Sequence, residues 1–254
     1  MNILREKISN KEKLVGTVVC LTDPCICEIV GNVGYDCVWI DMEHTYVSYK
    51  DVLCHLNAAR SANIPSIVRL PQDDFIATKK VLEMGPDGVI FPMVRSKKEA
   101  EDLIATTLYP PLGRRGFGPM RAIGYGAEDV KAYVTEKNLD LCRFLQIEHI
   151  DMIDDLEEIV KIPYIDGFIF GPNDLSASLG DFLNVYDEKT LCAIKRAIDI
   201  LKKHNKYIGL SGGMHPADIE VWSKLGLNML FAGGDWSFLY NQAKETLNVL
   251  KNHF

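Results

Sequence analysis

The chain has 254 residues, of which 47% are hydrophobic and 25% are charged, so its composition excludes a disordered or low-complexity protein. It carries 28 Lys and Arg against 35 Asp and Glu, and this acidic balance argues against a nucleic-acid-binding protein, which normally presents a basic face. No apolar run is long enough to span a bilayer, and residues 1–13 contain no apolar signal segment. The seven cysteines are scattered through apolar stretches, which favours reduced thiols, so we expect a cytoplasmic protein.

Short apolar runs alternate with segments of helical period along the chain. The runs are continuously apolar, which is typical of parallel strands buried on both faces. They are Leu14–Leu21, Cys37–Asp41, Ser66–Leu70, Gly88–Met93, Cys142–Glu148, Gly167–Gly171, Tyr207–Ser211 and Met229–Ala232. Eight such runs predict one α/β domain over residues 1–254, a (β/α)8 (TIM) barrel. An open doubly wound sheet is the alternative, weakened because no G-x-G-x-x-G follows the first run.

One long connection, from Thr106 to Asp140, interrupts this alternation. It contains a glycine-rich loop with Arg114 and Arg115, and we expect a helix from about Ala127 to Glu136. Long glycine-rich loops on compact domains are often functional lids. The two arginines are expected either to clamp a substrate or to lie in a solvated surface turn.

Polar residues gather at the C-terminal ends of the predicted strands, where barrels carry their chemistry. These are Asp41, Glu43 and His44 after the second strand, Arg69 at the third, Gln146 and Glu148 at the fifth, and Asn173 and Asp174 after the sixth. A single Asp or His at such a position is more often a turn or cap residue. Their convergence on one rim predicts a functional site.

The pair Glu148 and Asp174 predicts a cation site. Two carboxylates on adjacent strand ends repel each other unless they are protonated or share a cation. With oxygen ligands and no cysteine or second histidine beside them, the ion would be Mg²⁺ or Mn²⁺, or else Co²⁺. The alternative is a pair of helix-capping acids.

His44 and Arg69 complete a reaction hypothesis. An imidazole close to Asp41 is a natural general base, and Arg69 offers a positive fork for an oxyanion or carboxylate, or else forms a buried ion pair. With a hard cation, this set predicts aldol chemistry through a stabilised pyruvate enolate. No predicted strand holds a lysine in its interior or at its C-terminal end, which disfavours the Schiff-base route.

At these residues the chain resembles the HpcH/HpaI aldolase/citrate lyase family, the class II metal-dependent pyruvate aldolases of 4-hydroxy-2-oxoheptanedioate and 2-keto-3-deoxy sugar acids. The resemblance runs roughly from Leu14 to Tyr240. The matching motifs are Asp-Met-Glu-His at 41–44, Val-Arg-Leu-Pro at 68–71, Gly-Val-Ile-Phe-Pro-Met-Val at 88–94, Tyr-Pro-Pro-x-Gly-x-Arg-Gly from 109, Gln-Ile-Glu at 146–148 and Gly-Pro-Asn-Asp-Leu-Ser at 171–176.

The resemblance implies a phosphoenolpyruvate/pyruvate-type barrel that reversibly cleaves 4-hydroxy-2-oxo acids to pyruvate and an aldehyde. It implies that Glu148 and Asp174 bind the metal, that His44 paired with Asp41 is the acid/base, and that Arg69 steadies the pyruvate oxygen. Gln146 would support metal and pyruvate, and the backbone N–H groups of Asn173 and Asp174 would bind the pyruvate carboxylate. Such enzymes form homo-oligomers, hexamers or trimers of dimers, that exchange C-terminal helices, here 235–254.

Three departures, at Arg95, His149 and Met120–Ile123, are expected near the aldehyde side of the site and concern the identity of the aldehyde. The glycine pairs at 212–213 and 233–234 keep a phosphosugar isomerase or lyase open as an alternative. A CoA-ester lyase and a non-catalytic oxo-acid-binding barrel are further alternatives. The sequence specifies neither the aldehyde, nor the metal, nor the direction of flux.

Overall fold

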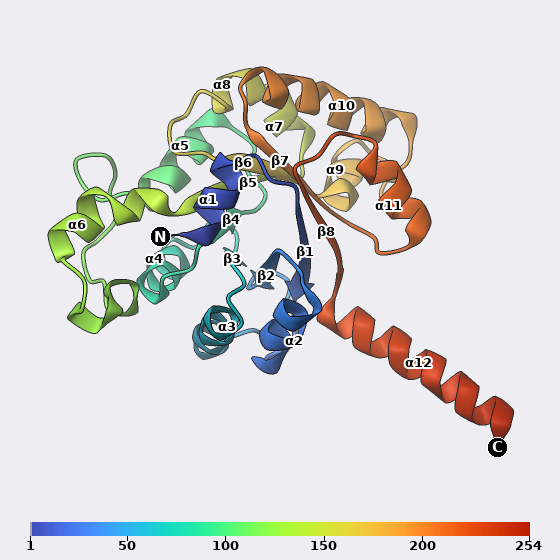
Figure 1. The fold of residues 1–254 in the computed structure, drawn as a ribbon. Coiled ribbons are helices and arrows are strands. Elements are labelled where there is room, and N and C mark those ends of the chain that lie inside the picture. Colours follow the sequence, from blue (N-terminus) through green and yellow to red (C-terminus); the bar gives the residue numbers. More distant parts are fainter. Residues whose placement is uncertain (1) are drawn as a thin grey trace.

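The computed structural model describes residues 2–254 and contains a closed barrel of eight parallel strands in the order β1 to β8 (Figure 1). The strands are β1 Leu14–Val19, β2 Cys37–Asp41, β3 Ser66–Arg69, β4 Gly88–Phe91, β5 Cys142–Ile147, β6 Gly167–Phe170, β7 Tyr207–Gly212 and β8 Met229–Gly234. The predicted barrel is confirmed. Strand β4 ends before Met93 because that residue has a positive φ of 54°, which no strand accommodates.

Helices follow the strands and surround the barrel. They are α1 Ile3–Ser9, α2 Cys25–Val33, α3 Tyr49–Ser61, α4 Phe75–Met84, α5 Lys97–Ala105, α6 Val130–Thr135, α7 Ile150–Asp154, α8 Leu156–Ile159, α9 Pro172–Ser178, α10 Glu188–Lys203, α11 Pro216–Ser223 and α12 Asp235–His253, with 3₁₀ segments η1 Arg121–Gly126 and η2 Lys137–Asp140. The helix expected at Ala127–Glu136 is the shorter α6 followed by η2. Within residues 2–254, no helix has the length and apolar character needed to cross a membrane.

The barrel interior is apolar at its N-terminal end and polar at its C-terminal end. Because side chains alternate along a strand, every second residue points inward. On β5 the inward residues begin with Cys142 and Phe144, which pack in the inner cluster together with Leu4 of α1. The same alternation then brings Gln146 and Glu148 to the C-terminal end, where both are buried.

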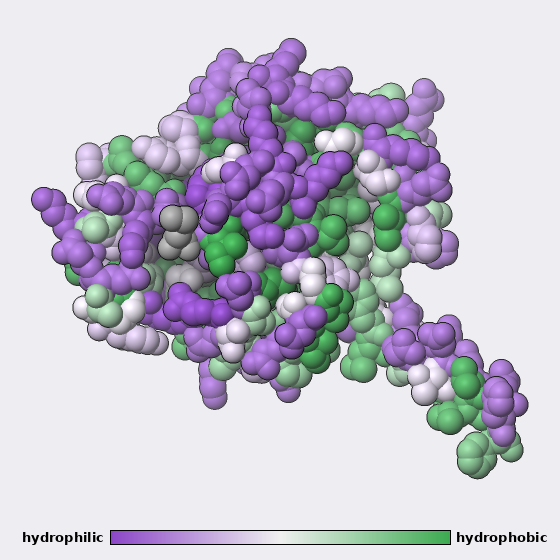
Figure 2. All heavy atoms as spheres, in the orientation of Figure 1, coloured by the Kyte–Doolittle hydropathy of each residue, from purple (hydrophilic) through white to green (hydrophobic). Residues whose placement is uncertain are grey.

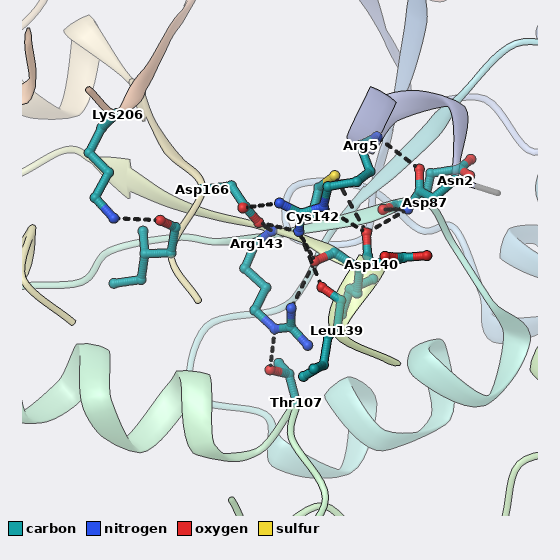
Figure 3. Close-up of polar contacts among 12 residues, drawn as sticks. Asn2, Arg5, Asp87, Thr107, Leu139, Asp140, Cys142, Arg143, Asp166 and Lys206 are labelled. Atoms are coloured by element: carbon teal, nitrogen blue, oxygen red, sulfur yellow. Dashed lines mark hydrogen bonds and ion pairs between the residues drawn. The ribbon is translucent and has the colours of Figure 1, made fainter. Parts of the chain in front are cut away.

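A network of polar side chains closes the N-terminal end (Figure 3). Arg5 of α1 forms an ion pair with Asp166, and its Nη2 also donates to the Leu141 carbonyl at 2.7 Å. Asn2 donates to the carbonyls of Asp87 and Asp140, at 2.7 and 3.0 Å. These bonds fix α1 across the strand starts.

Arg143 of β5 is the deepest member of this network (Figure 3). Its guanidinium is fully buried and donates to Thr107 Oγ1 at 2.6 Å and to the carbonyls of Leu141 and Asn138 at 2.8 and 2.9 Å. Burial lowers the pKa of Arg143 to about 10. This side chain ties both ends of the long connection to the barrel.

Helix α12 projects away from the barrel (Figure 1). Its first residue, Asp235, is buried, and its carboxylate accepts the backbone N–H groups of Cys20 and Leu21, which fixes the start of the helix to the loop after β1. From Leu239 onward every residue of the helix is exposed. Apolar side chains lie among its polar ones (Figure 2), and Leu239 and Tyr240 are 65% and 62% exposed.

Candidate active site

Asp41 and Arg69 form a buried ion pair at the C-terminal face. They are directly opposed in the register of β2 and β3, and Arg69 Nε and Nη2 donate to the two Asp41 carboxylate oxygens at 2.9 and 2.6 Å. The Arg69 guanidinium also lies 4.9 Å from the centre of the Trp39 ring. Both partners are buried. The arrangement fixes the guanidinium plane and leaves Nη1 as the nitrogen that does not bind Asp41.

The structure corrects the expected pairing of His44 with Asp41. The Asp41 carboxylate binds Arg69 and accepts the Glu43 N–H at 3.0 Å. His44 is mostly exposed, and the carboxylate nearest its ring is that of Glu43, with 3.8 Å between Nε2 and Oε2. The hydrogen bond from the Glu43 N–H to the Asp41 carboxylate closes a local turn after β2. The sequence spacing of Asp41 and His44 does not predict this turn.

Glu43 is the site residue that sequence reasoning missed as a functional group. Its Oε2 lies 3.1 Å from Arg69 Nη1, yet this buried oxygen accepts no hydrogen bond within residues 2–254. Burial raises the pKa of Glu43, against the opposing charges of Arg69 and His44. Its place between Asp41 and His44 in the Asp-Met-Glu-His segment was the sequence feature that could have identified it as a site residue.

Glu148 lies at the C-terminal end of β5 and is only 2% exposed. Its Oε2 accepts the Met93 N–H at 2.9 Å. Burial raises the pKa of Glu148 to about 7; the Met93 hydrogen bond and Arg69 oppose this shift, whereas the charges of Glu43 and Asp174 add to it. A carboxylate in this environment is poorly stabilised in its charged form.

Asp174 and Asn173 lie in the first turn of α9 and are exposed, and no side chain caps that helix. Asp174 is close enough to influence the pKa values of both Glu43 and Glu148. Gln146 is buried one inward position below Glu148, and its Oε1 accepts no hydrogen bond within the described chain. The structure therefore brings together Asp41, Arg69, Gln146, Glu148 and Asp174, with His44 at the rim.

The donor set fits a hard divalent cation. Three carboxylates, Glu43, Glu148 and Asp174, act on one another's charges, and a cation would offset this repulsion. The unused acceptors Glu43 Oε2 and Gln146 Oε1 suit the hydrogens of water molecules around such an ion. Within residues 2–254, no group of three or more His, Cys, Asp or Glu side chains is arranged to hold a metal. Two protein carboxylates would leave positions for water and substrate.

The arginines of the long connection lie outside this cluster. Arg115 is buried, donates to Asn138 Oδ1 at 2.7 Å and to Tyr133 OH at 3.2 Å, and forms an ion pair with Glu83. Arg114 is exposed and lies 5.2 Å from the centre of the Phe75 ring. Arg115 is thus neither the substrate clamp nor the solvated turn expected from the sequence; it holds the connection together.

The structure also shows where the three departures from the family pattern lie. Arg121, within Met120–Ile123, is buried, donates to Asn57 Oδ1 at 3.0 Å and bonds to the Met84 carbonyl at the end of α4. This segment therefore lies beside the helix that precedes β4, so its expected place near the aldehyde side of this barrel is wrong. His149 caps α7 and accepts the Asp151 N–H, and Arg95 is exposed on the loop after β4.

Two features bear on the alternative chemistries. Asp235 follows the second glycine pair in the sequence, and its carboxylate binds the N–H groups of Cys20 and Leu21. At the first pair, a side chain at Gly213 would collide with the Asp218 carboxylate, which therefore faces that candidate phosphate cradle. Like charges disfavour a phosphate there. None of the strands β1–β8 contains a lysine, as predicted, so no strand offers an amine for a Schiff base.

The C-terminal mouth of this barrel holds carboxylates, a fixed arginine and a histidine, an arrangement typical of an enzyme site that acts on an anionic substrate, and comparison with known proteins specifies the family. The model of the HpcH/HpaI aldolase/citrate lyase family matches residues 15–210. The chain belongs to this family, as its motifs predicted, and is therefore a carbon–carbon lyase of the aldolase class.

Named relatives cover nearly the whole chain. It is 32% identical to the hydroxypyruvate/pyruvate aldolase of Deinococcus radiodurans over 96% of this chain and 87% of that protein. It is 30% identical to the 2-keto-3-deoxy-L-rhamnonate aldolase of Salmonella gallinarum, over 96% and 91%. A crystal structure of an HpcH/HpaI aldolase/citrate lyase family protein from Burkholderia cenocepacia superposes with a TM-score of 0.91 at 27% identity, covering 99% of this chain and 100% of that one.

Proposed function

We propose that the protein reversibly cleaves 4-hydroxy-2-oxo acids to pyruvate and an aldehyde, with a divalent cation and the residues of the C-terminal face. The observation that carries the proposal is the buried Glu148 carboxylate, with its pKa raised to about 7, beside two further carboxylates and a fixed arginine. Such an arrangement is unfavourable in the protein alone and becomes favourable with a cation and an anionic substrate. The names of the relatives support pyruvate as the common product.

In this proposal Glu148 and Asp174 hold Mg²⁺, Mn²⁺ or Co²⁺. When bound, the ion supplies a Lewis acid that polarises the 2-oxo group of the substrate. Gln146 would accept a hydrogen bond from water at the ion, because its buried Oε1 accepts none within residues 2–254. Glu43 Oε2 also accepts none and would take a second such bond beside Arg69 Nη1, which lies 3.1 Å away.

Arg69 supplies the second positive charge. Its Nε and Nη2 are engaged by Asp41, and its Nη1 lies 3.1 Å from Glu43 Oε2. Nη1, which does not bind Asp41, would donate to the oxygen on which negative charge develops as pyruvate becomes its enolate. The backbone N–H groups of Asn173 and Asp174, in the uncapped first turn of α9, would bind the pyruvate carboxylate.

His44 is the proposed acid/base. In the cleavage direction it accepts the proton of the 4-hydroxyl group while the C3–C4 bond breaks, and the electron pair of that bond passes to the enolate. The C4 half leaves as the aldehyde, and the imidazolium formed at His44 then gives its proton to C3, which yields pyruvate and restores the neutral imidazole. The neighbouring carboxylate is Glu43, which we propose, in place of Asp41, as the group that orients the imidazole.

The direct test is a panel of 4-hydroxy-2-oxo acids with different aldehyde halves, assayed for pyruvate release. We expect release that stops with chelator and returns with Mg²⁺, Mn²⁺ or Co²⁺. Borohydride added with pyruvate should trap no covalent adduct, because no strand lysine can form an imine. Pyruvate release from no member of the panel, or full activity in excess chelator, would contradict the proposal.

We also propose that residues 1–254 form one barrel domain whose helix 235–254 docks on another copy in a homo-oligomer. Its Leu247 and Leu250 are exposed, whereas a helix surrounded by solvent normally carries polar residues on all faces. Leu247→Arg should reduce the mass measured by light scattering, whereas the adjacent Asn248→Arg adds the same charge on another face and should not. Unchanged mass in both variants would contradict this docking.

The cytoplasmic location stays a prediction.

A further inference from the structure

The carboxylate of Glu148 is held from two sides by neighbouring loops. On one side, the Met93 N–H of the loop after β4 donates to Oε2 at 2.9 Å. On the other side lies Gly171, which follows β6. Oxygen Oε1 is therefore the oxygen on the side of the loop that continues, three residues later, to Asp174.

Gly171 is required by space rather than by its backbone conformation. Its φ is −107°, a value that any residue adopts. A Cβ at this position would lie 2.6 Å from Glu148 Oε1, 2.7 Å from Cγ and 3.1 Å from Cδ. Carbon atoms pack best at about 3.5–4.0 Å, so even alanine would push the carboxylate away from its position.

Met93 contributes its backbone, held in an unusual conformation. Its φ of 54° lies in the left-handed region, which residues with a side chain rarely adopt. Such conformations persist where the surroundings favour them, and they cluster at functional sites. Here the conformation accompanies a hydrogen bond to a carboxylate that has no other donor within residues 2–254.

We propose that Gly171 and Met93 are positioning residues that set Glu148 for the cation. The Met93 N–H occupies Oε2, and the missing side chain at Gly171 lets Oε1 lie against the loop that carries Asp174. The gap at Gly171 then sets the spacing between the two carboxylates that share the ion. This inference rests on the proposed function for the cation itself, but it concerns how this chain shapes the site.

The test is the dissociation constant of Mn²⁺, measured by the electron paramagnetic resonance of free Mn²⁺ in the absence of substrate. Groups that orient metal ligands typically contribute about 10–100-fold to affinity, and Gly171→Ala should weaken Mn²⁺ binding by that factor. Gly118→Ala is the matched control, because a Cβ there meets no atom within 4 Å. Gly209→Ala, whose Cβ would lie 3.0 Å from Ile169 within the barrel, should lower thermal stability without changing Mn²⁺ affinity.

A second pair of variants tests the positioning of Glu148 by Met93 without changing Gly171. Met93→Gly keeps the N–H and suits the positive φ, so Mn²⁺ affinity should stay within about threefold of the unmodified enzyme. Met93→Val also keeps the N–H, but a β-branched residue strongly disfavours this φ, and affinity should fall about tenfold. Unchanged affinity in both Gly171→Ala and Met93→Val overturns the inference. Failure of the unmodified protein to bind Mn²⁺ instead contradicts the proposed metal dependence.

Discussion

The two ends of the barrel are both rich in charged residues, yet they differ in how those charges are satisfied. At the N-terminal end, Arg5 faces Asp166, and the buried Arg143 has three hydrogen-bond acceptors. At the C-terminal end, Gln146 Oε1 accepts no hydrogen bond within the described chain, nor does Glu43 Oε2, although Arg69 Nη1 lies 3.1 Å from it, and Glu148 accepts a single N–H. The charges of Arg5 and Arg143 are thus paired or hydrogen-bonded without a ligand, whereas the carboxylates and Gln146 of the C-terminal end keep acceptor atoms that a ligand would use.

This difference separates polar residues that stabilise the fold from polar residues that bind a ligand or take part in the reaction. A buried group with all its partners contributes to folding, and its loss leaves other groups unpaired. A buried group without partners disfavours the folded state and is tolerated where a ligand or reaction uses it. Substitutions at the two ends should therefore change stability and activity in opposite ways.

The largest expected effect is the loss of activity in Glu148→Gln. The substitution removes the charge of a proposed cation ligand, and we expect pyruvate release to fall by more than about 10³-fold, since such an ion is worth several kcal/mol in the transition state. The same variant should unfold at an equal or higher temperature than the unmodified protein. Activity retained together with a loss of stability would assign Glu148 to the structure instead.

Arg143→Met at the other end should show the reverse. It leaves the carbonyls of Leu141 and Asn138 without this buried donor, and we expect a loss of about 3 kcal/mol in the free energy of unfolding. The folded fraction should release pyruvate at the unmodified rate. Denaturant titration and a rate normalised to folded protein give the two numbers, and a lowered normalised rate would break the comparison.

The pH dependence of stability sharpens the contrast at Glu148. Its pKa of about 7 in the folded, metal-free protein lies above the ordinary value of 4.5, so the folded state retains a proton that the unfolded chain has lost. The stability contributed by the neutral form is present below pH 4.5 and is lost as the pH rises through 7. In chelator, the free energy of unfolding of Glu148→Gln should therefore exceed that of the unmodified protein by about 3 kcal/mol near pH 8, and by little near pH 4. A pH-independent difference would contradict the raised pKa.

The smallest effect is expected for Arg114→Ala. The exposed Arg114 contacts Phe75 and the Asp102 carbonyl, away from the carboxylate cluster. Stability should change by less than about 0.5 kcal/mol, and pyruvate release from the best substrate should stay within about twofold. A tenfold rise in KM with one aldehyde half would restore Arg114 as a substrate clamp.

The sequence predicted the parts of the site that depend on periodicity. Eight apolar runs predicted the barrel, and the end of the fifth run placed Gln146 and Glu148 at its C-terminal face. Contacts made across the fold were not predictable. The turn after β2 gives Asp41 to Arg69 and sets His44 beside Glu43, which spacing along the chain does not show. The role of Arg115 was not predictable either, because its partners Tyr133 and Asn138 come from the far end of the same connection.

The most direct measurement is the exchange of the C3 hydrogens of pyruvate with deuterium from the solvent, with the cation present and no aldehyde. It isolates enolate formation from the unknown aldehyde. The account predicts rapid exchange by the unmodified enzyme and exchange slowed by about 10²–10⁴-fold in His44→Ala, the usual contribution of a general base, with Mn²⁺ affinity nearly unchanged. Exchange no faster than with the cation alone would contradict pyruvate-aldolase activity at this face of the barrel.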